Sequence, residues 1–395
     1  MLIYSMREIP FGRPLIGDEE KIAVLKALES PQLVHGPISK QFEEEFSTFL
    51  GNNAFATSVS SATTGLYLAY LSLGLGPGDE VIVTSLTHVA TANSIIACGA
   101  EPIFVDIDIS SGNIDYNSIE RYVTKRTKAI SVVHYLGNPV DMTEITKISK
   151  KYGLKIVEDC ALALGSRIGE KHVGLFGDFG VFSFYPAKHI TTGEGGMLVS
   201  KTRSLISIAE KIKSFYYDKG ANDRSIPGVY DIEGFGMNFR MSEVTAAIGI
   251  EQLKKLPYFL IQRKRNFTKY LEYSKILDDF GQFIVKENTF AYNSHYCICF
   301  LLRPEISDIR NDVIRELKSN GIGTSVYYPI VIPYSKYYRS RKSSVHSIQE
   351  NSFPNAERIS SSSIALPVGP HLELQDVDRV CLTLRNLISK KTEQN

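Results

Sequence analysis

The 395-residue sequence contains only five cysteines and no long hydrophobic run. An odd, low cysteine count in so long a chain argues against a disulfide framework. The cysteines also lack metal-site spacing, so we expect no metal and five reduced thiols: Cys98, Cys160, Cys297, Cys299 and Cys381. No stretch is apolar enough to span a bilayer, and the N-terminus lacks the apolar core of a signal peptide. These absences predict a cytoplasmic protein.

The sequence also has almost no excess of charge. Its 44 Lys and Arg residues nearly balance its 43 Asp and Glu residues, which gives a net charge of +1. The basic residues are scattered among acidic ones and form no stripe, so neither nucleic acid nor a membrane is an expected partner. With 43% hydrophobic residues, the chain is long enough for one large domain and a smaller one.

Short apolar runs and amphipathic segments alternate through the first 200 residues. The runs predict strands at 54–59, 80–84, 102–105, 128–133, 154–157, 179–184 and 197–199, with helices between them that include 88–98, 114–125 and 142–152. Strands separated by helices are typical of βαβ units. We therefore predict an α/β fold: a mostly parallel, seven-stranded sheet with helices on both faces.

The pattern changes after this region. A polar, glycine-containing segment at 219–239 predicts a long loop, and the next predicted helix covers 241–256 and ends or kinks at Pro257. Later apolar runs predict strands at 296–302 and 324–328, followed by a terminal helix at 374–388. We predict a large domain at 1–257, whose segment 1–25 packs on the small domain, and a small α+β domain at 258–395.

The clearest chemical signal is the segment from Phe182 to Gly196. Pro186 has no backbone N–H group and ends the apolar strand before it. Lys188 therefore falls on a turn between two buried strands. By itself it fits an ordinary surface lysine, or a partly desolvated amine that forms a Schiff base with a carbonyl.

The pattern Ser-Phe-x-x-x-Lys-x-Ile-Thr-x-Gly-Glu-Gly-Gly around Lys188 resembles the active-site signature of the DegT/DnrJ/EryC/StrS family. These are nucleotide-sugar aminotransferases of fold type I that use pyridoxal 5'-phosphate (PLP). The resemblance covers residues 10–387 and implies that Lys188 carries the cofactor. A related branch, the keto-sugar 3-dehydratases, has a histidine at this position. Here Lys188 is intact and the histidine is His189, which favours transamination over dehydration.

Glu158 and Asp159 end a predicted buried strand, where α/β folds place ligands. A buried carboxylate needs a partner, and a protonated pyridine nitrogen would be one. The family gives this role to the aspartate, which implies Asp159, although an acid that caps the next turn also fits. Three positions later the family usually has a polar residue near the ring hydroxyl. The residue here is Leu162, so either another group serves or the cofactor's electronics differ.

The turn from Ser60 to Gly65 opens a predicted helix, whose free N–H groups and dipole attract phosphate. The family binds the cofactor phosphate there with a Gly-Thr pair, which corresponds to Ala62 and Thr63. Alanine is small enough to allow the same close approach. The resemblance adds the hydroxyl group of Ser183 to this phosphate site.

His88 and Asn238 complete the implied cofactor site. His88 matches the position at which the family stacks an aromatic ring on the cofactor, although a polar helix cap also fits. Asn238, in Gly-Met-Asn-Phe-Arg-Met, matches the family asparagine that reaches the phosphate of the neighbouring subunit. The match implies a homodimer with shared active sites, although a polar residue that caps the next helix also fits.

The implied reaction is ping-pong transfer of an amino group from glutamate to C3 or C4 of a nucleotide-linked keto-sugar, for polysaccharide or glycan biosynthesis. Three alternatives remain open from the residues. The first is a PLP-dependent keto-sugar dehydratase, and the second is an aminotransferase for a small phosphorylated ketone. The third is a non-catalytic member that binds a nucleotide sugar or regulates transcription.

Overall fold

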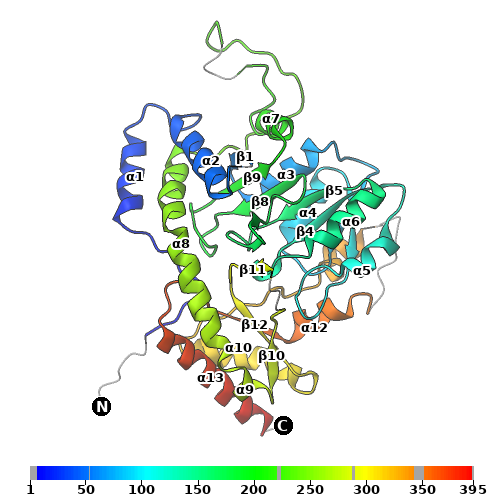
Figure 1. Ribbon diagram of the computed structural model, residues 1–395, viewed down its shortest axis with the longest axis vertical. Helices are drawn as coiled ribbons and strands as arrows, with labels where there is room; N and C mark the ends of the chain where they lie inside the picture. Colours follow the sequence, from blue (N-terminus) through cyan, green and yellow to red (C-terminus); the bar gives the residue numbers. More distant parts are fainter. Residues whose placement is uncertain (1–6, 53, 220–223, 287–289, 342–350, 394–395) are drawn as a thin grey trace.

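A seven-stranded sheet forms the centre of the computed structural model, which describes residues 7–52, 54–219, 224–286, 290–341 and 351–393 (Figure 1). The N-terminal residues 1–6 and part of the predicted 219–239 loop lie outside the described residues. Across the sheet the strands are β1 (Phe55–Val59), β9 (Gly196–Ser200), β8 (Phe179–Ser183), β5 (Lys155–Asp159), β4 (Thr127–Val133), β2 (Glu80–Thr84) and β3 (Glu101–Val105). Strands β8, β5, β4, β2 and β3 run parallel. Strand β9 runs antiparallel to both β8 and β1, so the predicted mostly parallel sheet is confirmed.

Helices cover both faces of this sheet, as predicted. Successive side chains of a strand point to opposite faces, so Val181 of β8 lies in one core and Phe182 in another. The first core contains α3 (Ala62–Ser72), α4 (Val89–Ala97) and α7 (Arg203–Ile212). On the opposite face, α2 (Pro37–Phe49) and α8 (Glu243–Leu271) cover β8 and β9, and α6 (Met142–Tyr152) covers β2 to β5.

Helix α8 has 29 residues and connects the sheet to the C-terminal part of the chain (Figure 1). Pro257 lies inside it, so of the two predicted outcomes, an end or a kink at this residue, the end is wrong. The residues before Pro257 already form a helix whose apolar side packs on the sheet, and the helix continues to Leu271. Helix α8 packs against α1 (Asp18–Leu28), α2 and α13 (Leu374–Thr392). The division at residue 257 therefore falls within one helix, and the two-domain organisation stays a prediction.

The C-terminal part has its own apolar core. An antiparallel sheet orders β10 (Gly281–Phe283), β12 (Ile298–Leu302) and β13 (Ser363–Leu366). Short strands β6 (Arg167–Ile168), β7 (Lys171–His172) and β11 (Ala291–Tyr292) form another small sheet. Helices α9 (Ser274–Leu277), α10 (Arg310–Ser319), α11 (Lys336–Ser340) and α12 (Pro354–Ser362) also belong to this part of the chain. None of the described helices has the length and apolar character needed to cross a membrane.

Two predicted elements are wrong. Residues 114–125 form only the single turn α5 (Tyr116–Ile119) and a 3₁₀ turn. The Thr124 hydroxyl group donates to the Glu80 carboxylate (2.5 Å), and the Thr124 backbone N–H group donates to the Thr127 hydroxyl (2.9 Å). Such side-chain hydrogen bonds compete with those of a helix. Residues 324–328 form a single bridge, from Ser325 to Ala365, and no strand.

The described N-terminal segment contacts both parts of the chain. Ile9 exchanges backbone hydrogen bonds with Gly321 (2.8 Å) and Gly323 (2.7 Å) in the C-terminal part, whereas α1 packs on α8. The N-cap of α1 is Gly17, whose N–H group donates to the Glu20 carboxylate at 2.7 Å.

Gly196 lies where β9 passes the beginning of α3. A Cβ atom there would lie 2.7 Å from the Ala62 nitrogen and 2.9 Å from the Phe182 carbonyl oxygen. We expect Gly196→Ala to lower the free energy of unfolding by about 1–3 kcal/mol, because both neighbours are backbone atoms that cannot rotate away. Urea unfolding followed by circular dichroism measures this change.

Gly76 provides a matched control, because an added Cβ atom there would lie 3.9 Å from the Cys98 carbonyl oxygen, an ordinary contact distance. Gly76→Ala should change the free energy of unfolding by less than about 0.5 kcal/mol. Equal losses in the two variants would show that crowding at Gly196 is not the cause.

Candidate active site

Four segments of the chain meet at one edge of the sheet. The parallel strands β2, β5 and β8 end at this edge, and β1 also ends there because Val59 pairs with Gly196. The segments at these ends carry the predicted residues Ala62, Thr63, His88, Asp159, Ser183 and Lys188. The sheet topology therefore gathers side chains from distant parts of the sequence, at the edge where open α/β sheets bind ligands.

Lys188 lies in the connection between β8 and β9. Its N–H group donates to the Tyr185 carbonyl at 2.8 Å, which closes a tight turn. The side chain is partly buried, and its Nζ atom lies 5.3 Å from the centre of the Tyr296 ring. Burial lowers the pKa of this amine to about 8, although Asp159 and Cys297 oppose the shift. About a tenth of the amine is thus neutral and nucleophilic at pH 7, far more than for an ordinary lysine.

Asp159, the last residue of β5, is 5% exposed. The Thr91 hydroxyl donates to Oδ2 at 2.8 Å, and the Ala161 N–H group donates to Oδ1 at 3.0 Å. A carboxylate accepts about four hydrogen bonds, so Asp159 retains capacity for a further donor. We did not predict Thr91 from the sequence. The available sequence signal was the spacing of Thr87 and Thr91, which are four residues apart. In the structure their hydroxyl groups lie 2.9 Å from each other.

The beginning of α3 has the properties of an anion site. Ser61 caps the helix by accepting the Thr64 N–H group at 3.2 Å. The first N–H groups of a helix, here those of Ala62 and Thr63, have no partner within the helix and attract anions. Ser183 lies nearby across the sheet, because it and Val59 both pair with Gly196.

His88 is the N-cap of α4, and its Nδ1 atom accepts the Ala90 N–H group at 3.2 Å. Burial and the charge of Lys188 lower the pKa of this imidazole, which favours the neutral ring. The ring lies 6.2 Å from that of Tyr328. His88 therefore caps a helix, and its stacking on a cofactor stays a prediction.

Asn238 lies on an exposed segment before α8. Its Oδ1 atom accepts the Nε–H group of Arg240 at 3.0 Å. The next carbonyl, that of Phe239, accepts the Ser60 N–H group at 2.9 Å, so this segment borders the α3 turn of its own chain. The predicted contact of Asn238 with a neighbouring subunit stays a prediction. Leu162 is 2% exposed and packs in the core shared with α3 and α4.

Glu158 lies next to Asp159 but is bonded differently. It is completely buried. It accepts four hydrogen bonds, from His134 Nε2 (3.0 Å) and from the N–H groups of Gly174, Phe176 and Gly177 (2.7 Å each). His134 Nδ1 accepts the Val140 N–H group at 3.1 Å, so the proton of the neutral ring lies on Nε2. Glu158 thereby ties the ends of β4 and β5 to the 174–177 segment.

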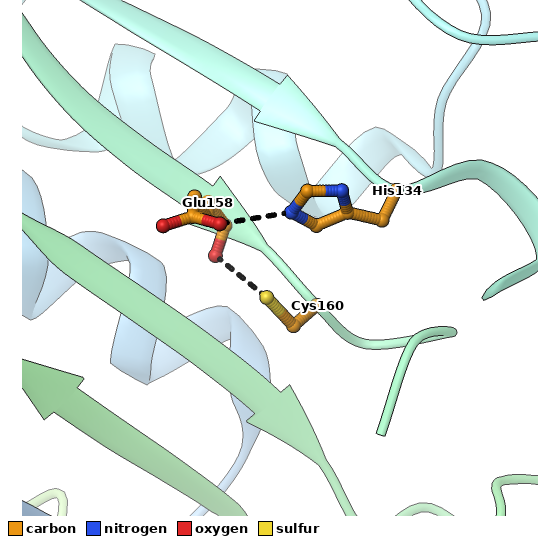
Figure 2. Close-up of side chains that lie close together, drawn as sticks. All are labelled: His134, Glu158 and Cys160. Carbon is orange, nitrogen blue, oxygen red and sulfur yellow. Dashed lines mark hydrogen bonds and ion pairs between the residues drawn. The ribbon is translucent and has the colours of Figure 1, made fainter. Parts of the chain in front are cut away.

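Figure 2 shows Glu158 with His134 and Cys160, a group with the spacing of metal ligands. The Cys160 thiol donates to the Glu158 carbonyl at 3.7 Å. Burial and the nearby carboxylates raise the pKa of this thiol well above its usual value, whereas metals bind the thiolate. The other two side chains are already hydrogen-bonded to the protein. These contacts indicate a structural cluster that positions Asp159.

A desolvated lysine, a strand-end carboxylate and a helix N-terminus at one edge of a mostly parallel sheet define the class of fold type I PLP-dependent transferases. Comparison with known proteins gives the family. The chain belongs to the DegT/DnrJ/EryC1/StrS aminotransferase family, whose model matches residues 14–385. The family and the enzyme class expected from the sequence are therefore confirmed.

Individual relatives agree over nearly the whole chain. The protein is 35% identical over 385 residues to the spore coat polysaccharide biosynthesis protein SpsC of Bacillus subtilis, covering 96% of this chain and 97% of SpsC. It is 34% identical over 391 residues to GDP-perosamine synthase of Escherichia coli O157:H7, covering 98% and 100%. Two solved structures of Spr1654 of Streptococcus pneumoniae are also similar. The PLP form gives a TM-score of 0.88 at 26% identity, and the PMP form gives 0.90 at 27% identity. Each comparison covers 97% of this chain and 99% of Spr1654.

The bond from Thr91 to Asp159 predicts a kinetic effect. We expect Thr91→Val to lower kcat/KM about ten- to a hundredfold, because a hydrogen bond to a charged group contributes roughly 1.5–3 kcal/mol. Steady-state kinetics of the loaded enzyme measures this loss. Thr91→Ser keeps the hydroxyl and should retain most activity, so an equal loss in both variants would contradict the role of the bond.

The Glu158 cluster predicts a stability effect. The Glu158 carboxylate only accepts hydrogen bonds. Glu158→Gln would place an amide NH₂ group, which is itself a donor, against the N–H groups that now donate to this carboxylate. We expect the free energy of unfolding to fall by about 2–4 kcal/mol, measured by urea denaturation. Glu144→Gln, which removes a surface charge paired with Lys147 at 2.6 Å, should change it by less than about 0.5 kcal/mol. A similar small change for Glu158→Gln would refute the proposed structural role.

Proposed function

We propose that the protein uses PLP to transfer an amino group from glutamate to C3 or C4 of a nucleotide-linked keto-sugar, for polysaccharide or glycan biosynthesis. The observation that carries the proposal is the position of the Lys188 amine at the same sheet edge as the Asp159 carboxylate. The names of SpsC and GDP-perosamine synthase support a nucleotide-sugar substrate and a polysaccharide product.

The donor set at this edge fits PLP. The phosphate would bind the N–H groups of Ala62 and Thr63 and the Ser183 hydroxyl, and the protonated ring nitrogen would donate to Asp159, which has acceptor capacity left. The neutral imidazole of His88 would lie against the ring. The aldehyde carbon would bond to Lys188.

When bound, PLP supplies an aldehyde that condenses with amines and a ring that withdraws electrons. The Lys188 amine would hold the cofactor and, when free, would act as the general base and acid of the proton transfer. Asp159 would keep the ring nitrogen protonated, and the Thr91 hydroxyl orients this carboxylate. The same groups would serve both the glutamate and the keto-sugar half-reactions, which predicts ping-pong kinetics.

We also propose a cytoplasmic homodimer. The chain between α7 and α8 extends away from the sheet (Figure 1), and its side chains Ile226, Val229, Ile232 and Phe235 are 60–66% exposed. Such an apolar surface is typical of a protein contact. In a homodimer, this segment of the partner subunit would lie near Asn238. The five cysteines are buried free thiols, which fits a reducing compartment.

The proposal predicts the effect of removing the amine. Lys188→Ala should lower turnover with glutamate and a keto-sugar by roughly a thousandfold or more, because both the covalent link and the proton carrier are lost. The visible absorbance of the loaded protein should disappear at the same time. Rate measurement and absorption spectroscopy test both effects, and an unchanged rate would refute the assignment.

Lys254→Ala is a suitable control, because Lys254 is 55% exposed and pairs with Glu251 on the surface of α8. This variant should retain full activity. Titrating the aminated enzyme with nucleotide keto-sugars identifies the acceptor, and the product mass separates amination from dehydration. A response only to small phosphorylated ketones would overturn the proposed substrate class.

A further inference from the structure

Lys188 is surrounded by side chains from several elements. Asp159 at the end of β5 and Cys297 before β12 favour the charged amine, whereas burial favours the neutral amine. His88 at the beginning of α4 and the neighbouring His189 both feel the charge of Lys188. The Tyr296 ring, whose centre lies 5.3 Å from Nζ, is an aromatic contact of this amine.

The Tyr296 side chain is fixed from several sides. It is 4% exposed, and its hydroxyl group lies 2.7 Å from that of Tyr327. Arg263 of α8 donates to the Tyr296 carbonyl at 2.8 Å, and its guanidinium group lies 5.9 Å from the ring centre. The His189 ring is 5.7 Å away. Tyr296 therefore presents a preorganised surface to the amine.

An aromatic ring suits an amine that must carry a proton in a reaction. The ring attracts an ammonium group through its quadrupole, but it offers no carboxylate that would hold the proton in an ion pair. It can thus retain a flexible lysine side chain in both protonation states. A carboxylate in the same place would instead fix the amine as ammonium.

We propose that Tyr296 is a positioning residue, whose ring holds the Lys188 amine beside the reacting carbon whenever the amine is not bonded to it, while Tyr327 and Arg263 hold the ring. The inference rests on the proposed function for the identity of that carbon. The contact between ring and amine is independent of the cofactor, so it can be tested without one.

The test measures Lys188 in the full-length protein freed of cofactor. Competitive labelling with acetic anhydride across a pH series, followed by peptide mass spectrometry, gives the pKa of this one amine, expected at about 8. Tyr296→Leu should lower that pKa by about one pH unit, because an aliphatic side chain still excludes water but no longer attracts the ammonium form. Tyr296→Phe keeps the ring and should leave it nearly unchanged.

Tyr270→Leu is the matched control. Tyr270 is also a buried tyrosine, with its hydroxyl bonded to the Pro367 carbonyl at 2.9 Å in the C-terminal core. The control should leave the labelling midpoint of Lys188 unchanged. An equal shift in Tyr270→Leu and Tyr296→Leu would overturn the proposal, because it would reflect general loosening.

Fluorinated phenylalanines at position 296 keep the shape of the ring while weakening its attraction for cations, so they provide a test even if Tyr296→Leu does not fold. The midpoint should fall stepwise with each added fluorine, and equal midpoints would overturn the proposal. In the loaded enzyme, Tyr296→Leu should lower kcat and Tyr296→Phe should restore it. Full turnover by Lys188→Ala would refute the proposed function but would leave the labelling results intact.

Discussion

The buried carboxylate of Glu158 is the interaction on which the site depends. A charge without exposure to water costs several kcal/mol unless it is paired or hydrogen-bonded, and four donors surround this one. Those donors come from the end of β4 and from the 174–177 segment, and the carboxylate itself belongs to β5. The network therefore fixes the sheet edge at the residue before Asp159.

Two pairs of neighbouring residues divide structural and chemical tasks. Glu158 and Asp159 point to opposite faces of β5, and only Asp159 retains capacity for a further donor. His189 is buried, with Nε2 bonded to the Ser294 carbonyl at 3.1 Å, and burial lowers its pKa well below the usual value. The preceding Lys188 instead faces the Tyr296 ring. In both pairs one side chain anchors the backbone and leaves the other available for chemistry.

Much of the fold could be predicted because local patterns and global packing agree. The strands of the large sheet have apolar side chains on both faces, and Pro186 ends the strand before Lys188. The failures have tertiary causes that sequence periodicity does not reveal. The helix predicted at 114–125 is interrupted where Thr124 bonds the distant Glu80, and α8 continues through Pro257 because both of its halves pack against other helices.

The sequence alone determined the order of the elements, the turn that carries Lys188, the strand end that carries Asp159 and the family resemblance. These depend on short-range periodicity, turn chemistry and motif spacing. Only the tertiary structure decided that Thr91 bonds Asp159 and that Tyr296 contacts Lys188. Those contacts join residues 68 positions or more apart in the sequence, and they form only when the parallel strands end at a common edge and α8 brings the C-terminal part against it.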